Sequence, residues 1–228
     1  MGLDQYLKKM PRYKGATAND VSMVESYLDW IEAKNKGSEH ANCTFKQWCG
    51  RDVDFNNNKV NDLIDFYSQF YEKKYSDWDI EKKYGYARIM DQVGYWRKAN
   101  QIHNWFVENV QDGEDDCRYH REVTKEDLEE LLDICETIKR IAIMESAPVE
   151  NGYVYENGKQ TPIYEDGALI VNAAEIENLL PTQSGFFFGG TGYDSYYMND
   201  IEHTIDVITK VIETTDFDRE MLYYISSW

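Results

Sequence analysis

The chain is poor in basic residues. Its 228 residues contain 24 Lys and Arg against 42 Asp and Glu, which gives a formal net charge of −18 at pH 7. A surface of that sign repels phosphate backbones and anionic membranes, so we expect no direct binding to duplex nucleic acid and no membrane partner. An aromatic content of 14% argues against a disordered acidic tail. The composition therefore predicts a folded protein with an acidic surface.

Long apolar runs and regular cysteine patterns are also missing. No stretch approaches the length of a transmembrane helix, and residues 1–9 lack the layout of a signal peptide. Cysteine occurs at only four irregularly spaced positions, which favours reduced thiols over a disulfide framework: Cys43, Cys49, Cys117 and Cys135. These features predict a cytoplasmic location.

Helical periodicity dominates the apolar pattern that is present. Residues spaced by three and four predict several helices, one of them running from about Asp91 to Gln111. Residues 153–164 instead read as a β-hairpin that turns at Asn157-Gly158. The expected fold class is mainly α (α+β), a helical domain with a small β-hairpin or minor sheet. We expect residues 1–228 to form a single domain.

The segment 95–106 concentrates polar residues that do chemistry on the predicted helix 91–111. At 100° per residue, His103 falls in the middle of the apolar arc, Asn100 lies at its edge, and Arg97 and Asn104 border it. Burying such groups costs free energy unless each finds a polar partner. The partner is either another part of this chain, the commoner case for a buried His, or a bound ligand.

A second unusual stretch, residues 180–194, combines glycines with three consecutive phenylalanines. Its glycines permit close backbone approach, and its phenylalanines and uncharged polar groups suit a flat aromatic ligand. The alternative is an aromatic loop that fills the core. The stretch matches neither a Walker A sequence nor a dinucleotide-binding fingerprint.

Evidence for metal or nucleophilic chemistry is weak. The pairs His40-x-x-Cys43 and Cys117-x-x-His120 have short ligand spacing, but the span between them is long and neither is a familiar zinc knuckle. Carboxylates crowd residues 112–116, which we interpret as a solvated acidic loop. No Gly-x-Ser-x-Gly motif surrounds Ser184. We therefore predict no metal and no cofactor.

Two long motifs carry a family resemblance. Residues 95–113, which begin Tyr-Trp-Arg-Lys-Ala-Asn, and residues 179–189, Leu-Leu-Pro-Thr-Gln-Ser-Gly-Phe-Phe-Phe-Gly, resemble a family of uncharacterised tailed-bacteriophage and prophage proteins, as does the opening Met-Gly-Leu-Asp. The resemblance implies a phage-encoded protein in the host bacterial cytoplasm, and it carries no established activity. It is poor over about 12–90 and 150–170, which are possible insertions particular to this member.

Our leading hypothesis is a non-catalytic phage accessory protein that binds a small, plausibly nucleotide-derived ligand and so sequesters a host defence signal. The cations would meet phosphate and a phenylalanine would stack on a base. The candidate ligand-binding residues are Arg97, Lys98, Asn100, His103, Asn104, Thr182, Gln183, Ser184, Phe186, Phe187, Phe188 and Thr191. Two alternatives stay open: an acidic, DNA-mimic-like inhibitor of a host protein, and a nucleotide-directed enzyme that uses His103 as acid or base.

Overall fold

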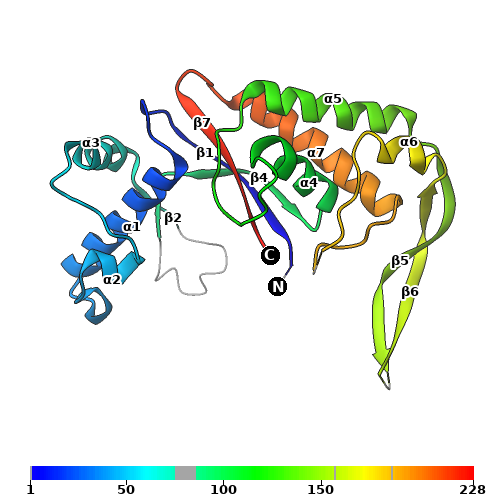
Figure 1. The fold of residues 1–228 in the computed structure, drawn as a ribbon, viewed down its shortest axis with the longest axis horizontal. Helices are drawn as coiled ribbons and strands as arrows, with labels where there is room; N and C mark the ends of the chain where they lie inside the picture. The colour runs from blue at the N-terminus through cyan, green and yellow to red at the C-terminus, as the bar shows by residue number, and fades with distance from the viewer. Residues whose placement is uncertain (1, 75–85, 157, 186) are drawn as a thin grey trace. The chain divides into compact units, whose positions relative to one another are not determined.

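The computed structural model describes residues 2–74, 86–156, 158–185 and 187–228 (Figure 1). The chain divides into two compact units. Unit 1 comprises residues 1–8, 92–217 and 222–228, and unit 2 comprises residues 9–91 and 218–221. The possible insertion at about 12–90 lies almost wholly in unit 2, whereas that at about 150–170 lies in unit 1. Their status as insertions stays a prediction.

The fold is α+β, and the expectation of a mainly α fold was wrong. Helices account for 44% of the chain and strands for 24%. A three-stranded sheet has the order β4-β1-β7, with β1 spanning Asp4–Pro11, β4 Asp91–Arg97 and β7 Glu220–Ser227. Sequence patterning placed the β4 segment in the predicted helix 91–111 and identified no strand at the β7 segment, so both strands escaped detection.

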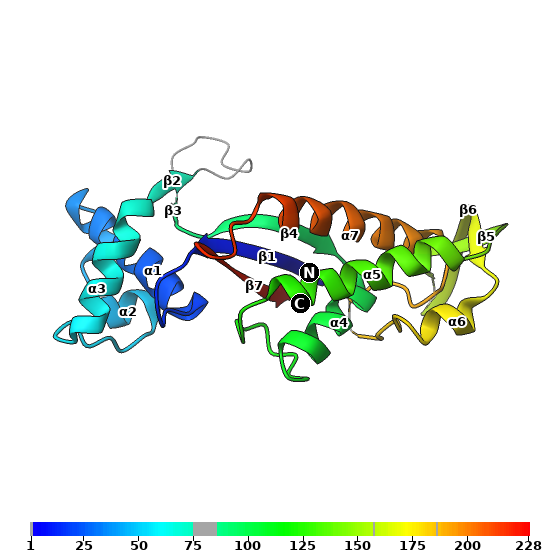
Figure 2. The same ribbon diagram turned by 90° about the horizontal axis from the view of Figure 1, so that it is seen from above.

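Unit 1 packs helices around its part of this sheet. Its helices are α4 (Asn100–Val110), α5 (Lys125–Ile141), α6 (Ala173–Glu177) and α7 (Ser195–Thr214). Helices α5 and α7 lie side by side, as both views show (Figures 1 and 2). Their apolar faces join α4 and the sheet in one core, where Trp96 of β4 donates from Nε1 to Thr204 Oγ1 of α7 at 2.9 Å.

A long β-hairpin, β5 (Met144–Glu156) and β6 (Lys159–Ile170), completes unit 1. The predicted hairpin is thus confirmed and is about twice as long as the segment 153–164. Its base contacts α7 closely: a Cβ on Gly167 would lie 2.9 Å from Ser195 Oγ and 2.6 Å from a Val149 methyl group. Only glycine therefore fits at this position, and the base of the hairpin is fixed to unit 1.

Unit 2 is built on the helix α1 (Ala18–Asn35), which packs with α2 (Phe45–Cys49), α3 (Asn58–Tyr67) and the antiparallel strands β2 (Glu72–Lys74) and β3 (Tyr86–Arg88). Two single 3-10 turns, Glu39–Ala41 and Ser68–Phe70, complete it. Aromatic side chains fill the space between α1 and α2, where Tyr27, Trp30, Phe45 and Phe55 have ring centroids 5.2–6.1 Å apart. Together with buried aliphatic residues such as Val21, Val24 and Leu63, these rings form the core of unit 2.

The segment 91–111 is a strand, a turn and a helix rather than one helix. Its β-prone residues Val93, Tyr95 and Trp96 pair with β1, and Lys98 then turns the chain with φ of +61°. Helix α4 begins only at Asn100. The predicted helix and its apolar face therefore exist only from Asn100 onward, whereas Arg97 belongs to an edge strand.

Candidate functional site

The two sequence motifs meet in unit 1, where Asn100 binds the backbone of the loop 181–192. Its Nδ2 donates to the carbonyls of Gly190 at 2.7 Å and Phe188 at 3.4 Å, and its Oδ1 accepts from the Gln183 N–H at 2.8 Å. Asn100 is buried, so these bonds replace water that it has lost. The polar group at the edge of the apolar arc thus has an internal partner.

Backbone contacts reinforce this junction. The carbonyl of Lys98 lies 2.9 Å from where a Cβ on Gly189 would stand, and Gly189 has φ of +98°. Both the close approach and the positive φ require glycine at this position. The Leu3 N–H donates to the Phe187 carbonyl at 3.3 Å, and the Lys98 N–H donates to the Leu3 carbonyl at 2.8 Å. The loop is therefore held against both β1 and the turn before α4.

His103 lies in a closed network with no exposed surface. The Tyr224 hydroxyl donates to Gln5 Oε1 at 3.2 Å and accepts from His103 Nδ1 at 2.8 Å, while Gln5 Nε2 donates to the Ala99 carbonyl at 3.0 Å. The Nε2 of His103 lies 3.1 Å from Asp115 Oδ2 but has no hydrogen-bond partner among the described residues. Because the Tyr224 hydroxyl donates its one proton to Gln5, Nδ1 is the imidazole nitrogen that donates in this arrangement.

Burial controls the charge of His103. Loss of hydration lowers its pKa below 6.5, although the nearby Asp115 carboxylate acts in the opposite direction. The Phe188 ring packs edge-on against His103 at 5.3 Å and against Trp228 at 5.9 Å, and Trp228 Nε1 donates to Asp115 Oδ1 at 2.8 Å. Aromatic rings and a carboxylate thus enclose the imidazole, which argues against its use as a general base.

The other candidate residues of these motifs lie nearer the surface. Arg97 and Lys98 are exposed, Phe187 is 48% exposed with φ of +69°, and Ser184 and Thr191 are exposed. Thr182 donates from Oγ1 to the Thr191 carbonyl at 3.3 Å. Asn104 and Gln183 are partly buried, and Gln183 Oε1 has no hydrogen-bond partner among the described residues. Phe186 lies outside the described residues.

This surface joins charged and aromatic groups from both motifs. A Cβ on Gly2 would lie 3.7 Å from Lys98 Cε and 3.9 Å from the Phe187 carbonyl, so the lysine stem and residue 187 border the same backbone position. The structure thus divides the predicted site in two. Asn100, His103 and Phe188 hold the fold together, whereas Arg97, Lys98 and Phe187 face solvent.

A further feature that the sequence did not single out as functional is the distal half of the hairpin. Cross-strand pairs share one face of a hairpin, so the pairs Tyr153–Pro162, Tyr155–Gln160 and Glu150–Tyr164 place three tyrosines side by side. Their exposed fractions are 46% for Tyr153, 72% for Tyr155 and 60% for Tyr164. We call Tyr153, Tyr155, Pro162 and Tyr164 the tyrosine face. The alternation Tyr-Val-Tyr opposite Pro-Ile-Tyr was its sequence signal.

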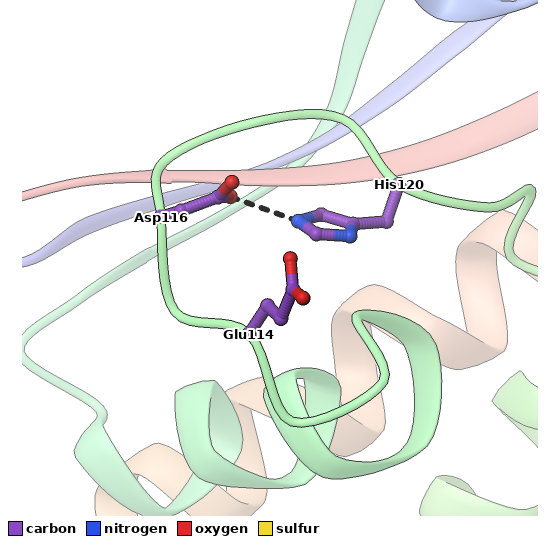
Figure 3. Close-up of side chains that lie close together, drawn as sticks. All are labelled: Glu114, Asp116 and His120. Carbon is purple, nitrogen blue, oxygen red and sulfur yellow. Dashed lines mark hydrogen bonds and ion pairs between the residues drawn. The ribbon is translucent and has the colours of Figure 1, made fainter.

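The loop after α4 holds a cluster of metal-ligand type. One ligand atom from each of Glu114, Asp116 and His120 lies within 4.8 Å of the others, and the three side chains point toward one another from the loop (Figure 3). His120 Nε2 is 2.8 Å from Asp116 Oδ1, and this bond lowers the pKa of Asp116. All four cysteines are unbridged, and Cys117 is not a member of this cluster.

No protein-family model, curated protein or solved structure matches the chain. Its function must therefore be argued from its own residues. Among the described residues, no helix has both the length and the apolar character needed to cross a membrane.

Proposed function

We propose that this protein binds another protein, and that the tyrosine face of the β5–β6 hairpin is its contact surface. The single observation that carries the proposal is the exposure of this segment. Between residues 150 and 164, every described residue except Pro162 is exposed. An isolated two-stranded hairpin is marginally stable in water, and clustered exposed aromatic residues are typical of interaction sites.

The two halves of the hairpin differ in how they contact the rest of unit 1. At the base, the Ile170 N–H donates to the Tyr193 carbonyl at 2.9 Å, and Tyr196 donates a hydrogen bond to Glu165. Beyond this base the distal half extends away from α5, α6 and α7 (Figure 1). An anchored base with an exposed, tyrosine-rich end is the geometry expected of a binding arm, because a partner can bury both faces of the distal strands.

Charge indicates what kind of partner fits. Between residues 144 and 170 the hairpin carries five carboxylates and one lysine, within a chain of net charge −18: Glu145, Glu150, Glu156, Lys159, Glu165 and Asp166. A second copy would bring the same charges together, which disfavours self-association. Tyrosine rings beside carboxylates suit arginine and lysine side chains, through cation–π contacts and ion pairs. The partner is therefore a protein with a basic surface, and in the phage setting that the motifs imply it is a host protein.

A capture experiment followed by a purified binary assay tests this function. Partners retained from a bacterial lysate by the wild-type protein are purified, and their affinity is measured for the wild type and for Y153S/Y155S/Y164S. We expect the triple variant to bind at least about 100-fold more weakly, since hot-spot aromatics contribute 2 kcal/mol or more each.

The matched control replaces two exposed apolar residues just outside the base of the hairpin, I143S/V171S, which leaves the net charge unchanged, and it should retain affinity. Unchanged affinity in the tyrosine variant would refute the proposal. So would a wild-type protein that sediments as a dimer and becomes monomeric in the tyrosine variant, because the hairpin would then bind a second copy.

Small-ligand binding is a second candidate function. The exposed cations Arg97 and Lys98 lie where β4 turns toward α4, and Lys98 borders the same backbone position as the exposed residue Phe187. Two adjacent cations and an aromatic ring suit a phosphate and a base. Thermal shift of the protein with a panel of mononucleotides and cyclic dinucleotides tests it: R97A/K98A should remove any shift without lowering the melting temperature of the unliganded protein. Absence of a shift across the panel would eliminate this candidate.

A further inference from the structure

The loop 111–120 of unit 1 brings together three side chains of metal-ligand type. Glu114 and Asp116 supply carboxylates and His120 supplies an imidazole, all within 4.8 Å of one another (Figure 3). Glu114 is exposed, so it can move onto an ion without breaking packing. Two carboxylates and one imidazole form a mixed oxygen and nitrogen donor set, which first-row divalent cations accept and which differs from the all-oxygen sets of calcium sites.

A buried amide in the same loop is an independent indication. Gln111 has no exposed surface, and its Nε2 donates to the Arg118 carbonyl at 3.0 Å, so its side chain spans the loop from its first residue to the segment between Asp116 and His120. Its Oε1 is buried and has no hydrogen-bond partner among the described residues. A buried amide oxygen without a partner costs free energy, and it is also an atom that a cation accepts as a ligand.

The contacts of the loop leave room for an ion. Asp116 Oδ1 accepts from the Arg118 N–H at 3.1 Å and from His120. Among the described residues, the polar neighbour of Asp116 Oδ2 is Nε of the 79%-exposed Arg118 side chain, at 3.6 Å. An exposed guanidinium at that distance is displaced at little cost. His120 is otherwise positioned by the turn through Cys117, which has φ of +57°.

We propose that Glu114, Asp116 and His120 bind a first-row divalent cation of the Zn²⁺ class, with the Gln111 amide oxygen as a further ligand. The bound ion would tie the acidic loop to the end of α4. Because Asp115, in the middle of this loop, also contacts His103 and Trp228, the ion would stabilise the junction between the two sequence motifs. This proposal is independent of the proposed function of the hairpin.

Calorimetric titration of the reduced protein with Zn²⁺ tests the site. We expect one ion per chain, and in H120A and E114Q an affinity lower by at least about 100-fold, the upper end of the loss seen on removing outer-shell partners. Ca²⁺ and Mg²⁺ should bind far more weakly. Glu114 is exposed, and its side chain forms no hydrogen bond or ion pair with the described residues, so E114Q keeps the test valid even if H120A unfolds.

Two controls separate this site from thiol binding. H40A and C117S should keep wild-type affinity, because neither side chain belongs to the cluster. With Co²⁺ as the probe, the protein should show d–d absorption without a thiolate-to-metal charge-transfer band. A charge-transfer band that disappears in C117S, a loss of binding in H40A, or unchanged Zn²⁺ affinity in E114Q and H120A would each overturn the proposal.

Discussion

At the scale of single residues, the most informative finding is that adjacent polar residues have opposite roles. Asn100 and Asn104 lie one turn apart on α4, yet Asn100 makes three hydrogen bonds to the loop 181–192 and Asn104 makes none that involves its side chain among the described residues. Burial decides the difference, since Asn100 is buried and Asn104 is half-buried. The pair offers a matched test of the internal role.

We predict that N100A lowers the free energy of unfolding by about 2–4 kcal/mol, because it leaves two carbonyls and one N–H of the loop without their partner. N104A should cost less than about 1 kcal/mol. Urea denaturation monitored by tryptophan fluorescence measures both. Equal losses in the two variants would show that the loop does not depend on Asn100.

A second prediction concerns His103 and pH. Its pKa is lowered in the folded protein, so between 6.5 and that lower value the unfolded chain binds the extra proton. Stability contributed by neutral His103 is therefore complete above about pH 6.5 and is lost as the pH falls below it. Unfolding free energies measured from pH 8 to pH 5 should decline for the wild type, with a shallower slope for H103Q.

Asp200 must be separated from this effect. Burial raises the pKa of Asp200 to about 6, so its contribution to stability is present below pH 4 and is lost as the pH rises toward 6. Where their pH ranges overlap, below pH 6, Asp200 and His103 therefore change the free energy of unfolding in opposite directions. Repeating the series in D200N and D200N/H103Q isolates the imidazole. A wild-type slope that persists in the double variant would assign the decline to other groups.

At the scale of elements, the sequence carries a clear signal wherever a few neighbouring residues determine the structure. Thr124 forms a capping box at the start of α5, since its Oγ1 accepts from the Asp127 N–H at 3.1 Å and Asp127 Oδ2 accepts from the Thr124 N–H at 2.8 Å. The Gly50 C-cap after α2 and the hairpin around residue 158 likewise follow from local chemistry.

Elements that depend on distant partners were missed. Strand β4 is stabilised by pairing with β1, which lies about ninety residues earlier in the chain, and β7 completes the same sheet from the other end of the sequence. The run Val93 to Trp96 is too short to separate strand from helix by periodicity alone. The turn after β4 also lacks a signal in the sequence. Lys98 adopts a positive φ there, a conformation that glycine or asparagine usually marks.

The same distinction explains the candidate site. Sequence showed which residues were unusual, but the partner of Asn100 lies some eighty to ninety residues away and that of His103 about 120 residues away. Only the packed structure shows that these partners are internal. The tyrosine face was hidden for the opposite reason, because a strand pattern of alternating tyrosines does not reveal that neither face is covered.

The helix cap supplies a prediction at this scale. T124A should destabilise unit 1 by about 1 kcal/mol, since it leaves the first-turn N–H of Asp127 without its acceptor. T137A, a substitution of the same kind within α5, should be neutral or slightly stabilising, because alanine favours helix interiors. Thermal unfolding followed by circular dichroism compares the two. A loss in T137A as large as that in T124A would contradict a specific capping effect.

At the scale of the whole molecule, net charge is the dominant property. Eighteen excess negative charges repel one another in the folded chain, and this repulsion weakens with salt as the Debye length falls from about 30 Å at 0.01 M to about 8 Å at 0.15 M. Ion pairs act in the opposite sense, but most of those in the structure are on the surface and contribute little: Lys36–Glu32, Lys46–Asp52, Lys125–Glu129 and Lys139–Glu202.

We therefore predict that NaCl raises the melting temperature over this range of ionic strength, whereas sucrose at equal osmolality, which does not screen charge, gives a smaller rise. A melting temperature that falls with NaCl would mean that ion pairs outweigh repulsion. Screening has the opposite effect on the proposed association, because attraction between the acidic hairpin and a basic partner weakens as salt increases. The same titration should thus stabilise the free protein while slowing its association with the partner, and this opposition distinguishes electrostatic steering from a general effect of salt on folding.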